Sequence, residues 1–396
     1  MVKNIKNNRI KIKNNSFHVT DSSNDGNKKI FFTRKKIIIF SLFFLITIAL
    51  FTCSIIFVFK TNIFSLMMQI KFGLLTKSKR FWFLLLIIYF FVTPIFNVIS
   101  LWIRVRRIVK ISFIQWFCLM IAIDFIKAVT PANFVYDPYT IFWMKMNGVP
   151  IRKATTIMFI NVWQWQLTQI LITIPSFIII VKHGYAMLTN QLNISIFSLM
   201  IIGLSIDIIG LVVTTLLCVS TNVHYFLSTI LNWFKKKFRL NYQTKSEIVE
   251  IYKKQKVMRK DFYEHLNDYS STILTFIFVL LEEIYVYAAT YFAFAFFLPQ
   301  GVEINFMSIF NVANVAYTAN KMIPLPGGEF STQLVMKQLF DVYGGIKNCP
   351  PNEKEDYIAD SILLWKWFNS YLIAFFGFFG FLYLTYDQMK TKNKKC

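Results

Sequence analysis

The chain has 396 residues, of which 56% are hydrophobic, 18% aromatic and 16% charged, and its formal net charge is +23. A soluble domain carries about 25% charged residues and a disordered chain has low hydrophobicity, so this composition excludes both classes. It predicts an all-α polytopic membrane protein, in which basic residues between apolar runs orient the chain and contact anionic lipid headgroups. Nucleic acid is not an expected partner.

The residue types that bind metals or carry out catalysis do not gather into motifs. No two of the five cysteines are spaced as Cys-x-x-Cys, and the four histidines are scattered along the chain. The sequence also lacks a P-loop, an HExxH motif and a Ser, His and Asp order typical of hydrolases. It therefore predicts neither a metal nor a cofactor, and a protein that is not an enzyme.

The N-terminal part combines a basic arm with an apolar run. Residues 1–36 carry ten Lys and Arg with many Asn and Ser, and we expect a disordered cytoplasmic arm. Residues 37–59 are an apolar run, longer than the apolar region of about 7–15 residues in a signal peptide, and predict an uncleaved transmembrane helix. Residues 60–80 are too polar to span and suit an amphipathic helix in the membrane interface.

Seven further segments approach the length of about 20 apolar residues that a span needs. They are 81–103, 111–129, 154–181, 194–219, 273–298, 306–323 and 357–386, which makes eight predicted spans. The transmembrane domain thus covers residues 37–386, and a basic tail follows at 387–396. A polar loop at 222–272, with ten basic and five acidic residues, is a candidate docking surface for a partner protein.

The distribution of basic residues gives a conflict in topology. The basic arm and the basic tail place both termini in the cytoplasm of a multi-pass protein of the cell membrane, which eight crossings satisfy. The loop 222–272 follows the fifth crossing and would then lie outside with its ten positive charges. An extra half-span in each half of the chain, at 130–153 and at 324–340, would remove the conflict, and the side of the loop stays open.

Proline interrupts both of these segments. Pro131 and Pro138 each remove a helix hydrogen bond in the first segment. The second segment must stop a helix at Pro324, Pro326, Gly327 and Gly328. A helix N-terminus after each break attracts anions, and two such re-entrant-like elements in corresponding halves predict a transporter-like site near the membrane midplane. Ordinary turns between helices are the alternative.

At these residues the sequence resembles the bacterial lysylphosphatidylglycerol synthase transmembrane, or flippase-like, domain family, over roughly residues 37–386. One family motif, Thr-Pro-x-x-x-Gly-Gly-Gln-Pro with a later Gly-Val, matches Thr130, Pro131, Pro138 and Gly148. A second, Pro-x-Pro-Gly-Gly, matches residues 324–328, and a third matches Trp365 and Tyr371. The resemblance implies lipid translocation, without the soluble aminoacyl transferase domain of the two-domain synthases.

The sequence departs from the family pattern at several motif positions. Val135 and Tyr136 replace the Gly-Gly pair, and Asp137 replaces Gln. The Glu expected after the second motif falls on Gln333, with Glu329 nearby, and Lys366 replaces an Arg that would bind phosphate with two hydrogen bonds. These departures imply a changed headgroup specificity or a loss of the family activity.

Ionisable residues inside the spans are expensive and usually face the interior of a bundle. We expect Asp124 and Lys127, three residues apart, to pair, and only one of Glu282 and Glu283 to face the interior. The predicted lipid-headgroup path consists of Asp137, Lys145, Asp207, Glu282, Glu329 and Lys366. Its cations would bind phosphate and its acids an amino or hydroxyl-rich headgroup, whereas structural ion pairs are the alternative.

The uncharged polar and aromatic residues of the spans receive structural interpretations. Asn311, Asn314 and Asn320 are expected to form hydrogen bonds between helices. Most tryptophans are expected to face lipid or the membrane interface, among them Trp163, Trp165, Trp365 and Trp367.

The sequence thus favours translocation of membrane lipids, or binding of anionic or modified phospholipid or glycolipid headgroups. Two other classes stay open. One is a membrane-embedded enzyme that modifies lipids, and the other is a non-catalytic subunit that docks a partner through residues 222–272.

Overall fold

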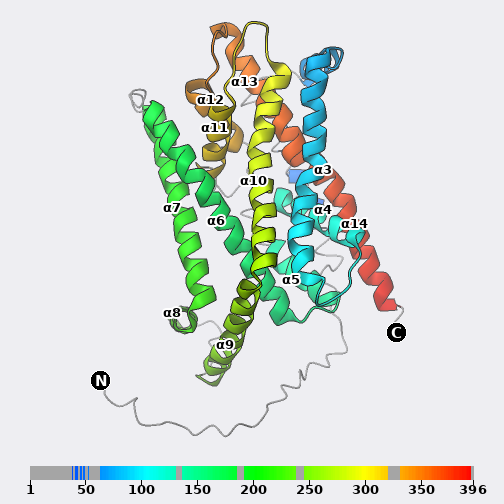
Figure 1. Cartoon of the computed structure of the whole chain (residues 1–396), viewed down its shortest axis with the longest axis vertical. Helices are drawn as coiled ribbons and strands as arrows, with labels where there is room; N and C mark the ends of the chain where they lie inside the picture. The colour runs from blue at the N-terminus through cyan, green and yellow to red at the C-terminus, as the bar shows by residue number, and fades with distance from the viewer. Residues whose placement is uncertain are drawn as a thin grey trace.

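The computed structural model describes residues 63–130, 136–184, 191–237, 245–319 and 331–393, and single helical positions between residues 38 and 52 (Figure 1). The predicted arm, most of the first predicted span, and the predictions at Pro131, Val135 and 320–330 lie outside these residues. The described elements are helices without a strand among them, which confirms the all-α class. Their bounds are α2 Ile63–Gly73, α3 Lys77–Val105, α4 Phe113–Val129, α5 Tyr136–Met146, α6 Ile151–Gly184, α7 Gln191–Val219, α8 Thr221–Lys237, α9 Lys245–Asn267, α10 Tyr269–Phe297, α11 Phe306–Ala319, α12 Ser331–Tyr343, α13 Pro351–Lys366, the π-helix η6 Trp367–Tyr371 and α14 Leu372–Asn393.

Five helical stretches in the described residues are long and apolar enough to cross a membrane, so the chain is a multi-pass membrane protein. They are Lys77–Val105 in α3, Ile151–Lys182 in α6, Phe197–Val219 in α7, Tyr269–Phe297 in α10, and Pro351–Asp387 through α13, η6 and α14. Two further predicted spans, 111–129 and 306–323, correspond to α4 and α11, whose 17 and 14 residues are short for a full crossing. The predicted count of eight spans is therefore not confirmed.

α4 and α5 form a first helical hairpin, whose two ends lie close together. A capping box starts α4, because Ser112 accepts from the Gln115 amide at 3.3 Å while the Gln115 side chain accepts from the Ser112 amide at 3.4 Å. The helix ends at Thr130, whose extended backbone is what a following proline requires. A Cβ on Gly148, beyond α5, would lie 3.8 Å from the Val109 side chain, which precedes α4.

α11 and α12 form a second hairpin of the same kind. Glu303, before α11, and Lys347, after α12, form an antiparallel bridge with N–O distances of 3.2 and 2.9 Å. A Cβ on Gly345 would lie 2.7 Å from the Ser308 hydroxyl, so the chain after α12 touches the first turn of α11. The hairpin therefore begins and ends at one place.

The two hairpins enter the bundle from opposite ends. Arg107, next to the base of the first hairpin, forms an ion pair with Asp268 at the start of α10. The other end of α10 leads directly to Glu303, at the base of the second hairpin. The 29 residues of α10 separate the two bases by about 43 Å at 1.5 Å per residue.

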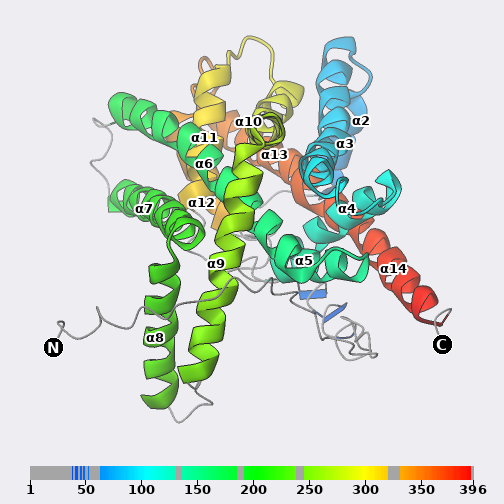
Figure 2. The ribbon, with the colours of Figure 1, turned by 60° about the horizontal axis from the view of Figure 1, so that its bottom comes forward.

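Residues 222–272, predicted as a polar loop, consist mostly of two helices, α8 and α9, followed by the start of α10. The two lie side by side and extend from the bundle (Figure 2). Arg152 at the start of α6 binds Asp261 of α9 at 2.7 Å, so this pair and the first hairpin share one end of the molecule. The C-terminus lies at the same end, and α14 continues as a helix through most of the predicted basic tail (Figure 1).

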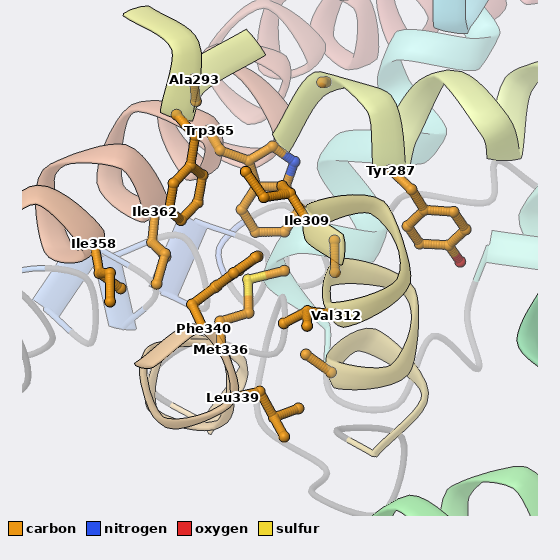
Figure 3. Close-up of a cluster of buried hydrophobic side chains, with 14 of the residues drawn as sticks. Tyr287, Ala293, Ile309, Val312, Met336, Leu339, Phe340, Ile358, Ile362 and Trp365 are labelled. Carbon is orange, nitrogen blue, oxygen red and sulfur yellow. The ribbon is translucent and has the colours of Figure 1, made fainter. Parts of the chain in front are cut away.

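Aromatic and aliphatic side chains from α10 to α13 form the main core at the base of the second hairpin (Figure 3). Phe340 of α12 packs on Phe294 of α10 with ring centroids 4.6 Å apart. The Tyr357 hydroxyl of α13 donates to the Phe294 carbonyl at 2.8 Å. This core also receives Leu66 and Ile70 of α2, which is a short helix as predicted for residues 60–80.

The start of α10 gives a first testable prediction. Hydrogen bonds with Ser271 and the charge of Arg107 hold the pKa of Asp268 below its ordinary value. A lowered pKa stabilises the fold above the ordinary aspartate pKa of about 3.9, and this contribution is lost as pH falls through the lowered value. Asp268→Asn keeps a capping side chain but loses the ion pair, so we expect a loss of about 0.2–1 kcal/mol at neutral pH.

Thermal melts of the purified protein in detergent, taken at neutral and acidic pH, measure this effect. The difference in melting temperature between the wild type and Asp268→Asn should become smaller below about pH 4. A difference that stays constant with pH would contradict the role given to the Asp268 charge.

Candidate functional site

Charged side chains lie near the tip of the first hairpin. Asp124 and Lys127, one turn before the end of α4, form the predicted ion pair at 3.3 Å. Their side chains keep 21% and 36% of their surface accessible, so neither is sealed in the packing. The Lys127 charge also acts on Asp137, in the first turn of α5.

Two adjacent carboxylates in the middle of α10 face different helices. Glu282 accepts a hydrogen bond from the Asn97 amide of α3. Glu283 accepts from the Trp165 indole at 2.7 Å and from the Gln169 amide, both on α6. Because α10 contacts both α3 and α6, the expectation that only one of the two carboxylates faces the interior is wrong.

The second hairpin and the π-helix contribute further polar groups. The Tyr89 hydroxyl of α3 donates to the Asn369 side chain of η6. Tyr317, near the end of α11, packs with its ring 6.3 Å from Tyr287 and 6.4 Å from Trp365, and lies within the electrostatic reach of Asp124, Lys127 and Glu283. π-Helical turns are rare and frequently mark functional sites.

The end of α11 lies against the middle of α10, because the Tyr317 and Tyr287 rings are 6.3 Å apart. Asp124 and Lys127, near the end of α4, lie within the electrostatic reach of Glu282. We call this group the acidic centre; its members are Tyr89, Asn97, Asp124, Lys127, Glu282, Glu283, Tyr317 and Asn369. It places three carboxylates against one ammonium group. No group of three or more His, Cys, Asp and Glu in the described part of the chain is arranged to hold a metal ion. The acidic centre thus presents a negative surface suited to an organic cation or to hydroxyl groups.

Two residues singled out from different family motifs are brought together. The Gln333 amide, in the first turn of α12, donates to the Tyr371 hydroxyl of η6 at 3.2 Å. Trp365 and Lys366 are buried at the end of α13, next to η6. This contact joins the second hairpin to the π-helix that carries Asn369.

The remaining predicted site residues lie in several places. Lys145 is exposed near the base of the first hairpin, eight residues or about 12 Å along α5 from Asp137. Asp207 is buried on the face of α7 that also holds Gly203 and Gly210, which pack on α11 and α6. Glu329 lies outside the described residues.

Pro138 and Gly148, the described proline and glycine of the first motif, have local roles. Pro138 is in the first turn of α5, where a missing backbone N–H costs no helix hydrogen bond, so the expectation that it breaks a helix is wrong. Gly148 has a φ of +96° in the turn between α5 and α6, a conformation that favours glycine.

An apolar groove of about 320 Å³ lies beside the acidic centre, between α3, α4 and α14. Its lining includes Phe90, Ile121 and Ile373, which lie within about one helical turn of Tyr89, Asp124 and Asn369. The groove opens on the outside of the bundle, where Phe91 and Phe379 are 51% and 53% exposed. A polar centre and an apolar groove are thus neighbours across three helices.

Sequence analysis missed several polar residues of this region. Asn97 and Gln169 are polar residues in apolar spans, a signal that could have identified them. Trp165 bonds Glu283 and Trp365 is fully buried, so the lipid-facing interpretation of these two tryptophans is wrong. The predicted hydrogen bond between helices is confirmed for Asn311, which accepts from Ser176 at 2.9 Å.

Arg104, one residue beyond the predicted span 81–103, is buried near the end of α3. Its guanidinium donates to Asn161 at 3.2 Å, to Thr275 at 2.7 Å and to Gln164. These partners are uncharged and come from α6 and α10. A buried positive charge therefore joins three helices between the acidic centre and the base of the first hairpin.

Comparisons with known proteins give two similar chains. The chain is 25% identical over 354 residues to "Uncharacterized protein MG306 homolog" of Mycoplasma pneumoniae, and the aligned region covers 87% of each chain. It is 26% identical over 359 residues to "Uncharacterized protein MG306" of Mycoplasma genitalium, covering 87% of this chain and 88% of the other. No family model and no solved structure matches.

Proposed function

We propose that this protein translocates membrane lipids between leaflets, with the lipid headgroup in the acidic centre and acyl chains in the apolar groove. The observation that carries the proposal is the position of the groove, within one helical turn of Tyr89, Asp124 and Asn369 on three different helices. A lipid needs both environments at once, because its headgroup loses hydration at the membrane midplane while its chains stay apolar.

In this proposal the two hairpins are re-entrant segments, and the described ends of α4 and α11 lie near the membrane midplane. Irregular backbone at membrane depth is tolerated where it lines a polar path, and paired broken elements from opposite sides are typical of transporters. The end that carries α8, α9 and the C-terminus is the cytoplasmic end, because α8 and α9 are rich in lysine. If α4–α5 and α11–α12 each enter the membrane and return to the same side, they add no crossing. The basic segment at 222–272 then lies on the cytoplasmic side with both termini.

The charge of the centre sets the expected headgroup. Three carboxylates against Lys127 favour lipids that carry an amino group, such as aminoacylated phospholipids, or many hydroxyls, such as glycolipids. Anionic phospholipids without these groups should be poorer substrates. This preference follows the acidic part of the path predicted from sequence, whereas Lys145 lies too near the hairpin base to share it.

A substitution in the groove tests the proposal. Cys118 lines the groove and is partly exposed, so Cys118→Trp should fill space that an acyl chain needs. We expect leaflet exchange of a fluorescent aminoacylated lipid in vesicles to fall at least tenfold, and Cys118→Ser to leave it unchanged. Ile209→Trp, on the exposed face of α7, controls for added bulk in the membrane.

The retention volume and melting temperature of each variant in detergent show whether it is folded. Folded Cys118→Trp protein with wild-type exchange would contradict the role of the groove. Exchange lost equally in Ile209→Trp would show that the effect is not specific to the groove, and would contradict it as well.

A further inference from the structure

A polar seam runs between α6 and α11 on the side of the acidic centre that faces the base of the second hairpin. Thr173 of α6 lies 3.4 Å from the Thr318 hydroxyl, and Ser176 donates to Asn311 at 2.9 Å. All four side chains are buried. From Gln169 to Ser176 the seam extends about 10 Å along α6, at 1.5 Å per residue.

The seam ends at Glu283. Gln169 donates to this carboxylate and also exchanges hydrogen bonds with the Tyr287 hydroxyl, at 2.9 and 3.1 Å. Glu283 is 7% exposed, and its neighbours Trp165 and Gln169 are neutral. A carboxylate buried in this way can hold a proton at low cost, because the neutral form avoids the desolvation penalty of a buried charge.

Buried polar atoms along the seam lack a protein partner within the described residues. They are the Thr290 hydroxyl, one turn beyond Tyr287 on the Glu283 face of α10, and the Asn311 amide nitrogen. Both residues are at most 3% exposed. Buried polar atoms are nearly always hydrogen-bonded, so these atoms indicate places for internal water.

The seam is closed at its other end. Beyond Gln169, toward the base of the first hairpin, Gln164 bonds the buried Arg104. A fixed positive charge repels protons and cations, as arginines do in selective pores. From Glu283 the polar side chains of the seam therefore extend in the other direction, along α6 toward Ser176 and Asn311.

Several charged or titratable groups lie near Glu283 on the elements packed around it. Glu282 is its neighbour on α10, and Tyr89, Tyr287 and Tyr317 lie near it on α3, α10 and α11. Asp124 and Lys127 of α4 act on Glu282. α13, which also packs on α10, carries the buried Tyr357, Asp360 and Lys366. Glu282 links Glu283 to the lipid-headgroup position, so a proton on Glu283 changes the charge that a headgroup meets.

We infer that Glu283 is a proton-carrying site, reached by water through the seam between α6 and α11, and that it couples lipid translocation to the proton gradient. The inference rests on the proposed function for its coupling, but the proton path can be measured on its own. No bond is formed or broken except O–H at the carboxylate, which takes a proton from water on one side of the membrane and releases it to water on the other side during the lipid step.

The experiment uses the full-length chain in vesicles of zwitterionic and aminoacylated phospholipid, with a pH-sensitive dye inside. A potassium gradient and valinomycin set the membrane potential, and the buffers contain choline in place of sodium. We expect a proton flux at least tenfold above that of protein-free vesicles. Glu283→Gln should reduce it to the protein-free level, whereas Glu264→Gln, an exposed carboxylate of α9, should not change it.

Thr290→Val nearly preserves side-chain shape and leaves Glu283 in place, so it tests the path even if Glu283→Gln does not fold. We expect its proton flux to be severalfold lower than that of the wild type. Wild-type flux in Glu283→Gln, or no flux above protein-free vesicles for the wild type, would overturn the inference. So would a flux that requires sodium. Lipid exchange measured in the same vesicles separates the two proposals. Exchange without proton flux refutes the proton path alone, whereas proton flux without exchange refutes both translocation and its coupling to the proton.

Discussion

Asp124→Asn combined with Glu282→Gln should lower exchange of an aminoacylated lipid by one to two orders of magnitude. Both substitutions keep side-chain shape, and the glutamine can still accept from Asn97. They leave Lys127 without its partner and the acidic centre with one carboxylate in place of three. A hydrogen bond to a charged group contributes about 1.5–3 kcal/mol, and each 1.4 kcal/mol is a factor of ten.

The measurement compares an aminoacylated, a glycosylated and an anionic lipid, each labelled, in the same vesicles. Exchange of the aminoacylated lipid should fall, and an anionic phospholipid should gain relative to it, because Lys127 then dominates the local charge. Asp341→Asn, which neutralises an exposed acid paired with Lys354, is the control and should change neither. Equal losses for all three lipids would contradict a headgroup role for these acids and indicate a structural one.

Gly377→Ala should destabilise the protein by about 1–3 kcal/mol, although alanine favours a helix over glycine. A Cβ at this position of α14 would lie 2.7 Å from the Phe125 Cβ of α4 and closer still to the Ile121 carbonyl. Neither atom is the end of a flexible chain, so α4 and α14 would have to move apart. The displaced face of α4 carries Asp124, so lipid exchange should fall as well.

Gly210→Ala provides a matched control on α7. A Cβ there would lie 3.0 Å from the end of the Gln166 side chain, which can rotate away, so the change should be nearly neutral. Melting temperatures of both variants in detergent measure the difference. A neutral Gly377→Ala would contradict the close packing of α14 on the first hairpin.

Sequence alone predicts the membrane class and the end of α4 before Pro131. Apolar runs with few charges are sufficient for the long helices, and the extended backbone at Thr130 follows from the proline after it. The hairpins are harder to recognise, because α4 and α11 are as apolar as a span. Only the contacts at Val109 and Gly148, and at Glu303 and Lys347, show that each hairpin returns to its starting end.

The candidate site was predicted in part, for a related reason. Charges stand out in an apolar span, so Glu282 was included in the predicted path, whereas Asp124 and Lys127 were expected only to pair with each other. Their partners are neutral, such as Asn97 and Gln169, and neutral polar residues in spans usually serve packing alone. Which of them meet depends on the crossing of helices distant in sequence, which periodicity does not contain.

The most direct test of the account is leaflet exchange by the wild-type protein in vesicles, with aminoacylated, glycosylated and anionic lipids labelled in turn. The account predicts exchange above that of protein-free vesicles, faster for the aminoacylated or glycosylated lipid than for the anionic one. Folded protein that exchanges none of the three, or the anionic lipid fastest, would contradict it.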